Sequence, residues 1–373
     1  MIIAVAFLGL KIATSRAITI AIIIVIGLAL AWFASTRWPL TRTLGSGIAR
    51  ARAARDRVGR DRLRIVGKAA LASWFAGLTY GRIRQYLRSE VPLGQDIRIY
   101  YRAVQLWLHG GNPWSAAIVV GTHARVFSYA GSPATTILLA PSALLSEDQF
   151  TALWLALTAM SAVAIVRWLR LPLWWILFPP TVEALYSGNP QIVVLMLLLA
   201  GAARSGGLAD ALAVGLKVYA LVPLLGERRP RRIILALSVT VATVLVAPSL
   251  WVDYLEQLGS ISARLATESA NGYSAFYYPL LLIPTAIAIA LLWRIDRRAA
   301  AWLAVPALWP ASEFHYSTLA LPVMTPLLAV LLAIPIQRLA PFVIMLYVGW
   351  RYASGPVRDR LDAWVTVASD SPG

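Results

Sequence analysis

The sequence contains no cysteine and few charged residues. Without cysteine the chain can form no disulfide, thiol nucleophile, iron–sulfur cluster or cysteine-liganded zinc site. Charged residues make up only 14% of the chain, whereas they make up about a quarter of a typical soluble protein. Hydrophobic residues reach 59% of the 373 residues, and the mean hydropathy is +0.68. We therefore predict an all-α, polytopic integral membrane protein with no room for a large soluble domain.

Lysine and acidic residues are also scarce, and nearly all the basic residues are arginine. The chain has 3 lysines, 31 arginines and 17 acidic residues, which give a net charge of +17. On a soluble protein this charge would suggest nucleic-acid binding, but lysine and arginine collect in the cytoplasmic loops of membrane proteins. We therefore expect no nucleic-acid partner. The preference for arginine is typical of a GC-rich genome, and we expect a protein of the bacterial plasma membrane.

Apolar runs predict about ten to twelve transmembrane helices, since each needs about 20 residues. Residues 17–34 are expected to be a retained anchor, and the nine arginines from Arg37 to Arg64 a cytoplasmic loop, although a helix on anionic lipid is an alternative. We divide the chain into residues 1–64 (anchor and arginine-rich loop), 65–350 (transmembrane domain) and 351–373 (polar tail). Further runs, several shorter than a full crossing, lie near residues 65–80, 132–146, 150–168, 172–187, 191–204, 208–226, 233–251, 277–293, 299–316, 318–334 and 340–350.

Charge clusters give this arrangement an orientation. Residues 228–232 and 294–298 are basic and fall on the side of the arginine-rich loop after an even number of crossings. Residues 252–276 hold more acidic than basic residues and fall on the opposite side. The segment from Gly81 to about Gly131 is then extracytoplasmic.

That segment contains QDIRIYYRAVQLWLHGGNPW, residues 95–114, which predicts an amphipathic helix ended by Gly-Gly-Asn-Pro. Four of its residues follow one another at steps of three or four and share one face, namely Asp96, Tyr100, Ala103 and Trp107. A carboxylate, aromatic rings and guanidinium groups together suit a sugar and a phosphate. An interfacial helix with snorkelling charges is the alternative. The residues concerned are Asp96, Arg98, Tyr100, Arg102, Ala103 and Trp107.

Two basic side chains stand out in apolar surroundings. Lys217 interrupts the run 210–226, and a buried ammonium needs an anion, either a lipid phosphate or an acid such as Asp210 or Glu183. A structural ion pair is the alternative to a functional role. His315 ends another run, so we expect it at the membrane rim, where it could bind a phosphate near neutral pH. A capping or core histidine is the simpler interpretation.

Motifs for metals and nucleotides are missing. The sequence has no His-x3-His, no Asp-x-Asp, no phosphate-binding Gly-rich loop and no Gly-x-Ser-x-Gly. We therefore expect neither a metal ion nor a cofactor. Four acids nevertheless lie close to apolar runs, where a charge is costly unless it lines a polar cavity. They are Asp96, Glu183, Asp210 and Glu313.

Six segments follow one another in an order that matches a known family. They are Asp96 to Trp114, FSYAGSPATTILLAP (127–141), ALYSGNPQIVVLMLLLA (184–200), GLKVYALVPLL (215–225), NGYSAFYY (271–278) and EFHY (313–316). On these segments the chain resembles glycosyltransferase family 87, the polyprenyl-phosphate-mannose-dependent α-mannosyltransferases of the GT-C superfamily. The resemblance covers about residues 65–335. It departs from the family pattern where Gly-Asn-Pro-Gln replaces Gly-Gln-Asn, and where the proline after Lys217 is shifted.

The resemblance implies that residues 65–350 form a GT-C-like catalytic bundle whose cavity opens to the extracytoplasmic side. Asp96 would be the general base, and His315 the essential histidine near the donor phosphate. The remaining positions that the resemblance or the residue chemistry places at the donor phosphate and sugar are Arg98, Tyr100, Arg102, Asn189, Gln191, Lys217, Asn271, Ser274 and Tyr316.

The predicted function is inverting transfer of a mannosyl, or another hexosyl or pentosyl, unit from a polyprenyl-phosphate sugar to a cell-envelope glycolipid or glycan. Asp96 would deprotonate the acceptor, while Arg98, Arg102, Lys217 and His315 would stabilise the leaving phosphate without a metal. A flippase or transporter of lipid-linked sugars is the alternative, and it needs no base. A membrane scaffold is a third interpretation, under which the polar residues would not converge.

Overall fold

The computed structural model describes residues 46–115, 117–120, 125–203, 207–228, 230–268, 272–310 and 312–352. The chain divides into two compact units, residues 1–77 and 78–373, and each is considered by itself. The anchor predicted at residues 17–34 and nearly all of the predicted tail lie outside the described residues.

The described part of the first unit is a single helical segment. It belongs to α3 (Ser46–Arg88), whose last residues lie in the second unit. From Ser46 onward the arginine-rich segment is therefore helical, and it continues without a break into the apolar run 65–80. This part of the predicted arginine-rich loop is helical because alanine and arginine are strong helix formers and no proline interrupts them, while its side of the membrane stays a prediction.

The second unit is built almost entirely of helices, which confirms the all-α prediction for the described residues except at one hairpin. In that hairpin β1 (Ile118–Val120) pairs antiparallel with β2 (Arg125–Phe127), with Val119 opposite Val126. The helices are α4 (Gln95–Leu108), α5 (Pro133–Leu139), η1 (Ala140–Leu144), α6 (Glu147–Trp168), η2 (Leu173–Leu177), α7 (Pro179–Ser187), α8 (Gln191–Ala203), α9 (Leu208–Leu216), η3 (Val218–Ala220), α10 (Leu221–Gly226), α11 (Pro230–Val246), α12 (Pro248–Glu268), α13 (Pro279–Ile295), α14 (Arg297–Leu308), η5 (Phe314–Val323), α15 (Pro326–Leu332) and a last helix over Leu339–Tyr352.

Few of these helices are long enough to cross a membrane. By length and composition α6 qualifies, and up to three spans are present in the described chain if each of two bent pairs counts as one. The pairs are α7 with α8, bent by 113°, and α11 with α12, bent by 103°. Several of the about ten to twelve predicted spans are instead short or broken helices, among them Pro133–Leu144, Pro279–Ile295 and Leu339–Tyr352.

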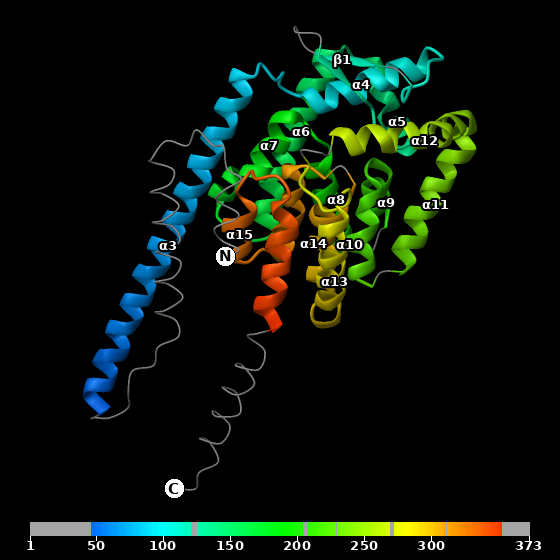
Figure 1. Cartoon of the computed structure of the whole chain (residues 1–373). Helices are drawn as coiled ribbons and strands as arrows, with labels where there is room; N and C mark the ends of the chain where they lie inside the picture. The colour runs from blue at the N-terminus through cyan, green and yellow to red at the C-terminus, as the bar shows by residue number, and fades with distance from the viewer. Residues whose placement is uncertain are drawn as a thin grey trace. The chain divides into compact units, whose positions relative to one another are not determined.

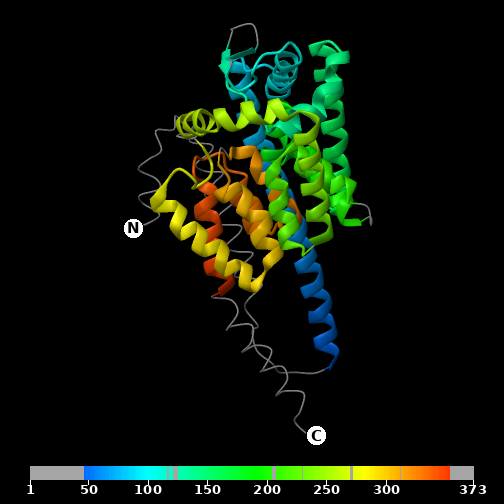
Figure 2. The ribbon, with the colours of Figure 1, turned by 90° about the vertical axis from the view of Figure 1, so that its right-hand side faces the viewer.

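The bends gather the loop elements at one end of the helices of the second unit. Figures 1 and 2 both show α4, the hairpin and α12 at the same end of α6, α9 and α11, with α12 lying across that end. The turn between α11 and α12 occurs at Ala247, directly before Pro248, where proline cannot continue the helical hydrogen bonds.

Two glycines bring α4 against the break between α7 and α8. Gly94 (φ 72°) precedes α4, and Gly188 (φ 69°) ends α7, both in the left-handed region that glycine adopts most easily. The Gly94 amide donates to the carbonyl of Tyr186 at 2.8 Å. A Cβ on Gly188 would lie only 3.0 Å from Ile97 Cγ2. Close approach of two glycine backbones thus places the first turn of α4 beside residue 189.

Candidate functional site

Asp96 lies in the first turn of α4, as the amphipathic pattern predicted. The helix begins at Gln95 and ends at Leu108, and Gly110 follows with φ 80°. Asn189, in the break between α7 and α8, donates through Nδ2 to Asp96 Oδ2 at 2.8 Å. Among the described residues no hydrogen bond reaches the other oxygen, Oδ1. Asp96 is half-buried, and its carboxylate is held through one oxygen.

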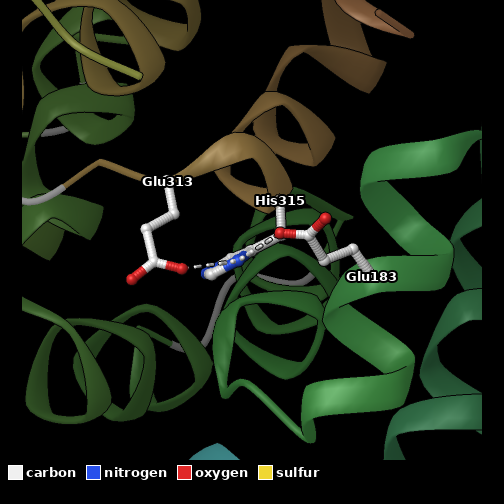
Figure 3. Close-up of side chains that lie close together, drawn as sticks. All are labelled: Glu183, Glu313 and His315. Atoms are coloured by element: carbon white, nitrogen blue, oxygen red, sulfur yellow. Dashed lines mark ion pairs between the residues drawn. The ribbon is translucent and has the colours of Figure 1, made fainter. Parts of the chain in front are cut away.

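His315 lies between two carboxylates. Its Nδ1 is 3.6 Å from Glu183 Oε1 on α7 and 3.7 Å from Glu313 Oε2, just before η5. Figure 3 shows the imidazole with Glu313 on one side and Glu183 on the other. The His315 side chain is buried, whereas that of Glu313 is 68% exposed and faces open space. At this position the carboxylates of Glu183 and Glu313 would balance the positive charge of a protonated imidazole.

Gln191 connects His315 to the break that holds Asp96. Its Nε2 donates to the His315 carbonyl at 2.7 Å, and its backbone amide donates to Asn189 Oδ1 at 3.2 Å. The Ser-Gly-Asn-Pro-Gln segment therefore reaches both α4 and η5. Asp96 and His315, which are 219 positions apart in the sequence, are close enough for the charge of Asp96 to affect the pKa of His315.

Lys217 marks a break in the apolar run where one continuous helix was expected. It separates α9 from η3 and has an extended backbone (φ −151°, ψ 112°). Thr135 Oγ1 lies 2.9 Å from the Leu216 carbonyl, which the break leaves without a helical partner. The Lys217 Nζ lies 5.2 Å from the centre of the Tyr100 ring. The sequence did not predict this break, because no proline or glycine stands at the position.

The acids suggested as partners of Lys217 are paired elsewhere. Asp210 is buried and contacts Arg232 Nη1 at 3.1 Å, and Glu183 contacts Arg82 Nε at 2.6 Å. Within the described chain Lys217 forms no ion pair. Of the two anions considered for Lys217, neither acid forms an ion pair with it, and a lipid phosphate stays a prediction.

A cavity of about 290 Å³ lies beside Lys217. One wall is polar and aromatic, and another is formed by apolar side chains of α12 and the segment before α13. Asp96 itself does not line it, but Tyr100, one turn further along α4, does. The residues that define it most clearly are Tyr100, Lys217, Tyr254, Ile261, Phe276 and Tyr316.

Arg98 and Arg102 do not reach this cavity. Arg98 contacts Glu147 at 2.9 Å and Asp148 at 2.8 Å, and Arg102 contacts Glu147 at 2.9 Å. Both acids belong to the first turn of α6, where negative charge also suits the helix dipole. The two arginines fasten α4 to α6, and their placement does not support the predicted contact with a donor phosphate.

The structure places two of the three remaining predicted site residues, Ser274 and Tyr316. Ser274 is buried and accepts a hydrogen bond from the Phe276 amide at 3.3 Å, which shapes the loop before α13. Tyr316 lines the cavity and packs edge-on against Tyr219, with ring centres 5.3 Å apart. Asn271 lies outside the described residues.

The ion pair between Arg82 and Glu183 is the part of the site that the sequence analysis missed. Glu183 was singled out as an acid near an apolar run, but its partner was sought in Lys217. Arg82 stands at the end of the run 65–80, where an arginine is equally typical of a topology signal. The only sequence signal was the cost of an unpaired acid in an apolar run.

Glu183, Glu313 and His315 are also the described residues that could hold a metal ion. One ligand atom from each lies within 4.8 Å of the others. The set of two carboxylates and an imidazole is compatible with zinc or manganese. However, one oxygen of Glu183 is already bound to Arg82, and a protonated His315 satisfies the same carboxylates without an ion.

Comparisons of the chain with protein-family models, with curated proteins and with solved structures found no match.

Proposed function

We propose that this protein is a membrane glycosyltransferase that moves a mannosyl, or another glycosyl, unit from a polyprenyl-phosphate sugar to a glycolipid or glycan of the cell envelope. One observation carries the proposal. A half-buried carboxylate, Asp96, is oriented by Asn189 and lies one helical turn from Tyr100, which shares a cavity with the unpaired cation Lys217. The resemblance to glycosyltransferase family 87 points to the same function and is part of the proposal.

In the proposed reaction Asp96 Oδ1 accepts the proton of an acceptor hydroxyl. The hydroxyl oxygen attacks C1 of the donor sugar, and the C1–O bond to phosphate breaks with its electron pair leaving on the phosphate. One displacement inverts the configuration at C1. The leaving phosphate is a stable anion and needs no proton, so a single carboxylate suffices and the proposal requires no metal.

In the proposed reaction, Lys217 and a protonated His315 stabilise the charge that develops on the phosphate. Lys217 lines the cavity, and His315 lies behind it next to Tyr316, with ring centres 5.0 Å apart. Positive groups fixed in a water-poor cavity stabilise such charge more strongly than groups in water, because they need not reorganise. Arg98 and Arg102 are not part of this proposal, since acids of α6 already bind them.

The lipid part of the donor would lie along α12. Leu258, Ile261 and Leu265 of that helix, with Phe276, give the cavity an apolar wall next to Lys217. Large apolar side chains are also exposed on α11 and α13, where Leu245 is 80% and Leu280 is 92% exposed. Exposed apolar surface of this kind is typical of contact with a bilayer and supports placement in a membrane.

The direct test is to incubate the purified protein with polyprenyl-phosphate-mannose and an extract of bacterial membrane glycolipids. The proposal predicts a glycolipid product heavier by one hexose, identified by mass spectrometry, together with release of polyprenyl phosphate. Movement of the donor across a vesicle bilayer without any product would instead indicate a flippase. If neither a product nor movement of the donor is detected, the proposal is contradicted.

A further inference from the structure

Glu313 is an acid that the proposed reaction does not use. Its side chain is 68% exposed, although it directly precedes a run of buried residues that begins with Phe314 and His315. Among the described residues its carboxylate forms no hydrogen bond, and its one ion-pair contact is to His315 Nδ1 at 3.7 Å. Its oxygens can therefore accept hydrogen bonds from a ligand.

The backbone on both sides of Glu313 is held in place. Its carbonyl accepts a hydrogen bond from the Tyr316 amide at 3.0 Å, at the start of η5. On the other side Ser312 is buried, its Oγ donates to the Pro306 carbonyl at 3.1 Å, and its own carbonyl accepts from the Tyr273 amide at 2.8 Å. The open carboxylate thus belongs to a well-fixed stretch of chain, and it lies on the side of the imidazole away from Glu183 (Figure 3).

This carboxylate lies in the same region as Asp96 and Lys217. The charges of both residues are close enough to act on Glu313. The charges of Asp96 and Glu313 also both act on the hydroxyl groups of Tyr100 and Tyr316, two residues that line the cavity. Glu313 is therefore a second carboxylate beside the part of the cavity that these two tyrosines line.

The carboxylate and the ammonium of this region suit different parts of a ligand. The ammonium of Lys217 attracts a phosphate, whereas the carboxylate of Glu313 repels one. A carboxylate only accepts hydrogen bonds, so its neutral partners are O–H and N–H donors. Adjacent hydroxyl groups of a sugar present two such donors, and hydrogen bonds to a charged acceptor are about twice as strong as those between neutral groups. Glu313 thus suits the neutral, hydroxylated part of a ligand whose anionic part lies at Lys217.

We propose that Glu313 is a sugar-binding residue whose carboxylate accepts hydrogen bonds from hydroxyl groups of a glycosyl unit attached to a lipid phosphate. The identification of this ligand as the donor rests on the proposed function. In that reaction C1 of the sugar lies between the phosphate at Lys217 and the base Asp96, and the charge of Glu313 interacts with both residues. Glu313 then determines which sugar is accepted, because a site with a hydrogen-bonding group for a substrate hydroxyl disfavours an analogue that lacks it.

The test is a comparison of donor binding, which requires no turnover. The probes are farnesyl-phosphate-mannose and farnesyl methyl phosphate, a phosphate diester of the same charge without hydroxyl groups. Their affinities for the full-length protein in detergent are measured by isothermal titration calorimetry. The proposal predicts that wild-type protein prefers the mannosylated lipid, and that Glu313→Ala lowers this preference by about 10- to 100-fold. The affinity for farnesyl methyl phosphate should not weaken, because the substitution removes an anion near Lys217.

Two further variants make the comparison specific. Glu313→Gln keeps the size of the side chain and one acceptor oxygen, so it should retain part of the preference, and it serves as the test if Glu313→Ala does not fold. Glu256→Ala removes an exposed carboxylate from α12 and is the matched control. It should leave both affinities unchanged.

Three results would overturn the sugar-binding role. The first is the absence of a preference in wild-type protein, or a preference that survives both substitutions of Glu313. The second is equal weakening of both lipids, which would indicate a structural role. The third is loss of the wild-type preference in EDTA, which would mean that a metal ion held with Glu183 and His315 contacts the sugar instead.

Failure of the proposed function gives a different result. A preference that depends on Glu313, without transfer of the sugar to any glycolipid, would support the sugar-binding role and contradict the glycosyltransferase activity. If the wild-type protein binds neither lipid, both proposals are contradicted.

Discussion

At the scale of single residues, the orientation of Asp96 depends on one hydrogen bond. Asn189→Ala removes the 2.8 Å contact to Oδ2 and frees the carboxylate to rotate. Misplacement of a reacting group by about 1 Å lowers a rate by about 100-fold. We therefore expect kcat for glycosyl transfer to fall by about 10- to 100-fold with little change in KM for the donor. A large drop in the melting temperature of Asn189→Ala would point to a structural role for Asn189 instead.

A second residue-scale prediction concerns pH. Because the folded pKa of His315 is raised, the stability that its charge contributes is fully present below about pH 6.5 and is lost as the pH rises through the folded pKa. We expect the melting temperature of the protein to fall as the pH is raised from about 6.5 through the folded pKa of His315. In His315→Gln this part of the pH dependence should disappear. A pH profile unchanged by the substitution would mean that His315 is neutral throughout.

The sequence predicted individual residues better than their partners. Asp96 could be found because a helical period and a Gly-Gly-Asn-Pro stop surround it within 20 residues. Arg98 and Arg102 were equally visible, but Glu147 and Asp148, which bind them, lie at least 45 positions away. Only the packing of α4 on α6 brings these charges together, and a local sequence pattern cannot predict that packing.

At the scale of elements, the break at Lys217 is expected to depend on Thr135. The Thr135 hydroxyl donates to the Leu216 carbonyl, and Thr135→Val leaves that carbonyl unsatisfied in the protein interior. We expect the free energy of unfolding to fall by about 1–3 kcal/mol. The KM for the lipid donor should also rise, because Lys217 is less firmly held. Thr267→Val, on exposed surface of α12, is the control for loss of a threonine hydroxyl.

The α3–α7 contact is expected to matter for stability more than any surface ion pair. Arg82→Met leaves Glu183 as a buried charge that has lost its closest partner. Breaking a buried pair in this way costs about 3–5 kcal/mol, against about 0–1 kcal/mol for exposed pairs. Thermal unfolding in detergent should show the difference, with Arg298→Met, whose side chain is 56% exposed and lies 3.8 Å from Glu227, as the comparison. Equal effects would contradict the importance given to the Arg82 pair.

The sequence predicted where apolar runs lie, but not how they are divided. The run 150–168 became one helix, α6, because a Ser146–Gln149 capping box starts it and no proline or glycine follows until Pro172. The runs on either side of Asn189 became a pair bent by 113°, and that bend, not the runs, supplies Asn189 and Gln191 to the site. A hydropathy pattern gives no information on such angles.

At the scale of the whole molecule, the absence of cysteine makes the proposed orientation measurable. Single cysteines at His109 and Glu256 should react with a membrane-impermeant maleimide in intact cells, because both positions are placed outside. A cysteine at Arg231 should react only after permeabilisation. Each substitution is at an exposed side chain, so the fold should be retained. Labelling of all three positions from the same side would contradict the orientation.

The central claim is that the carboxylate of Asp96 removes a proton from a sugar acceptor. The most direct measurement compares the purified protein with Asp96→Asn for transfer from polyprenyl-phosphate-mannose and for donor binding. The account predicts that transfer falls by about 100-fold or more while donor binding is retained, because a general base contributes about 10²–10⁴ to the rate. Transfer at an unchanged rate in Asp96→Asn would contradict it.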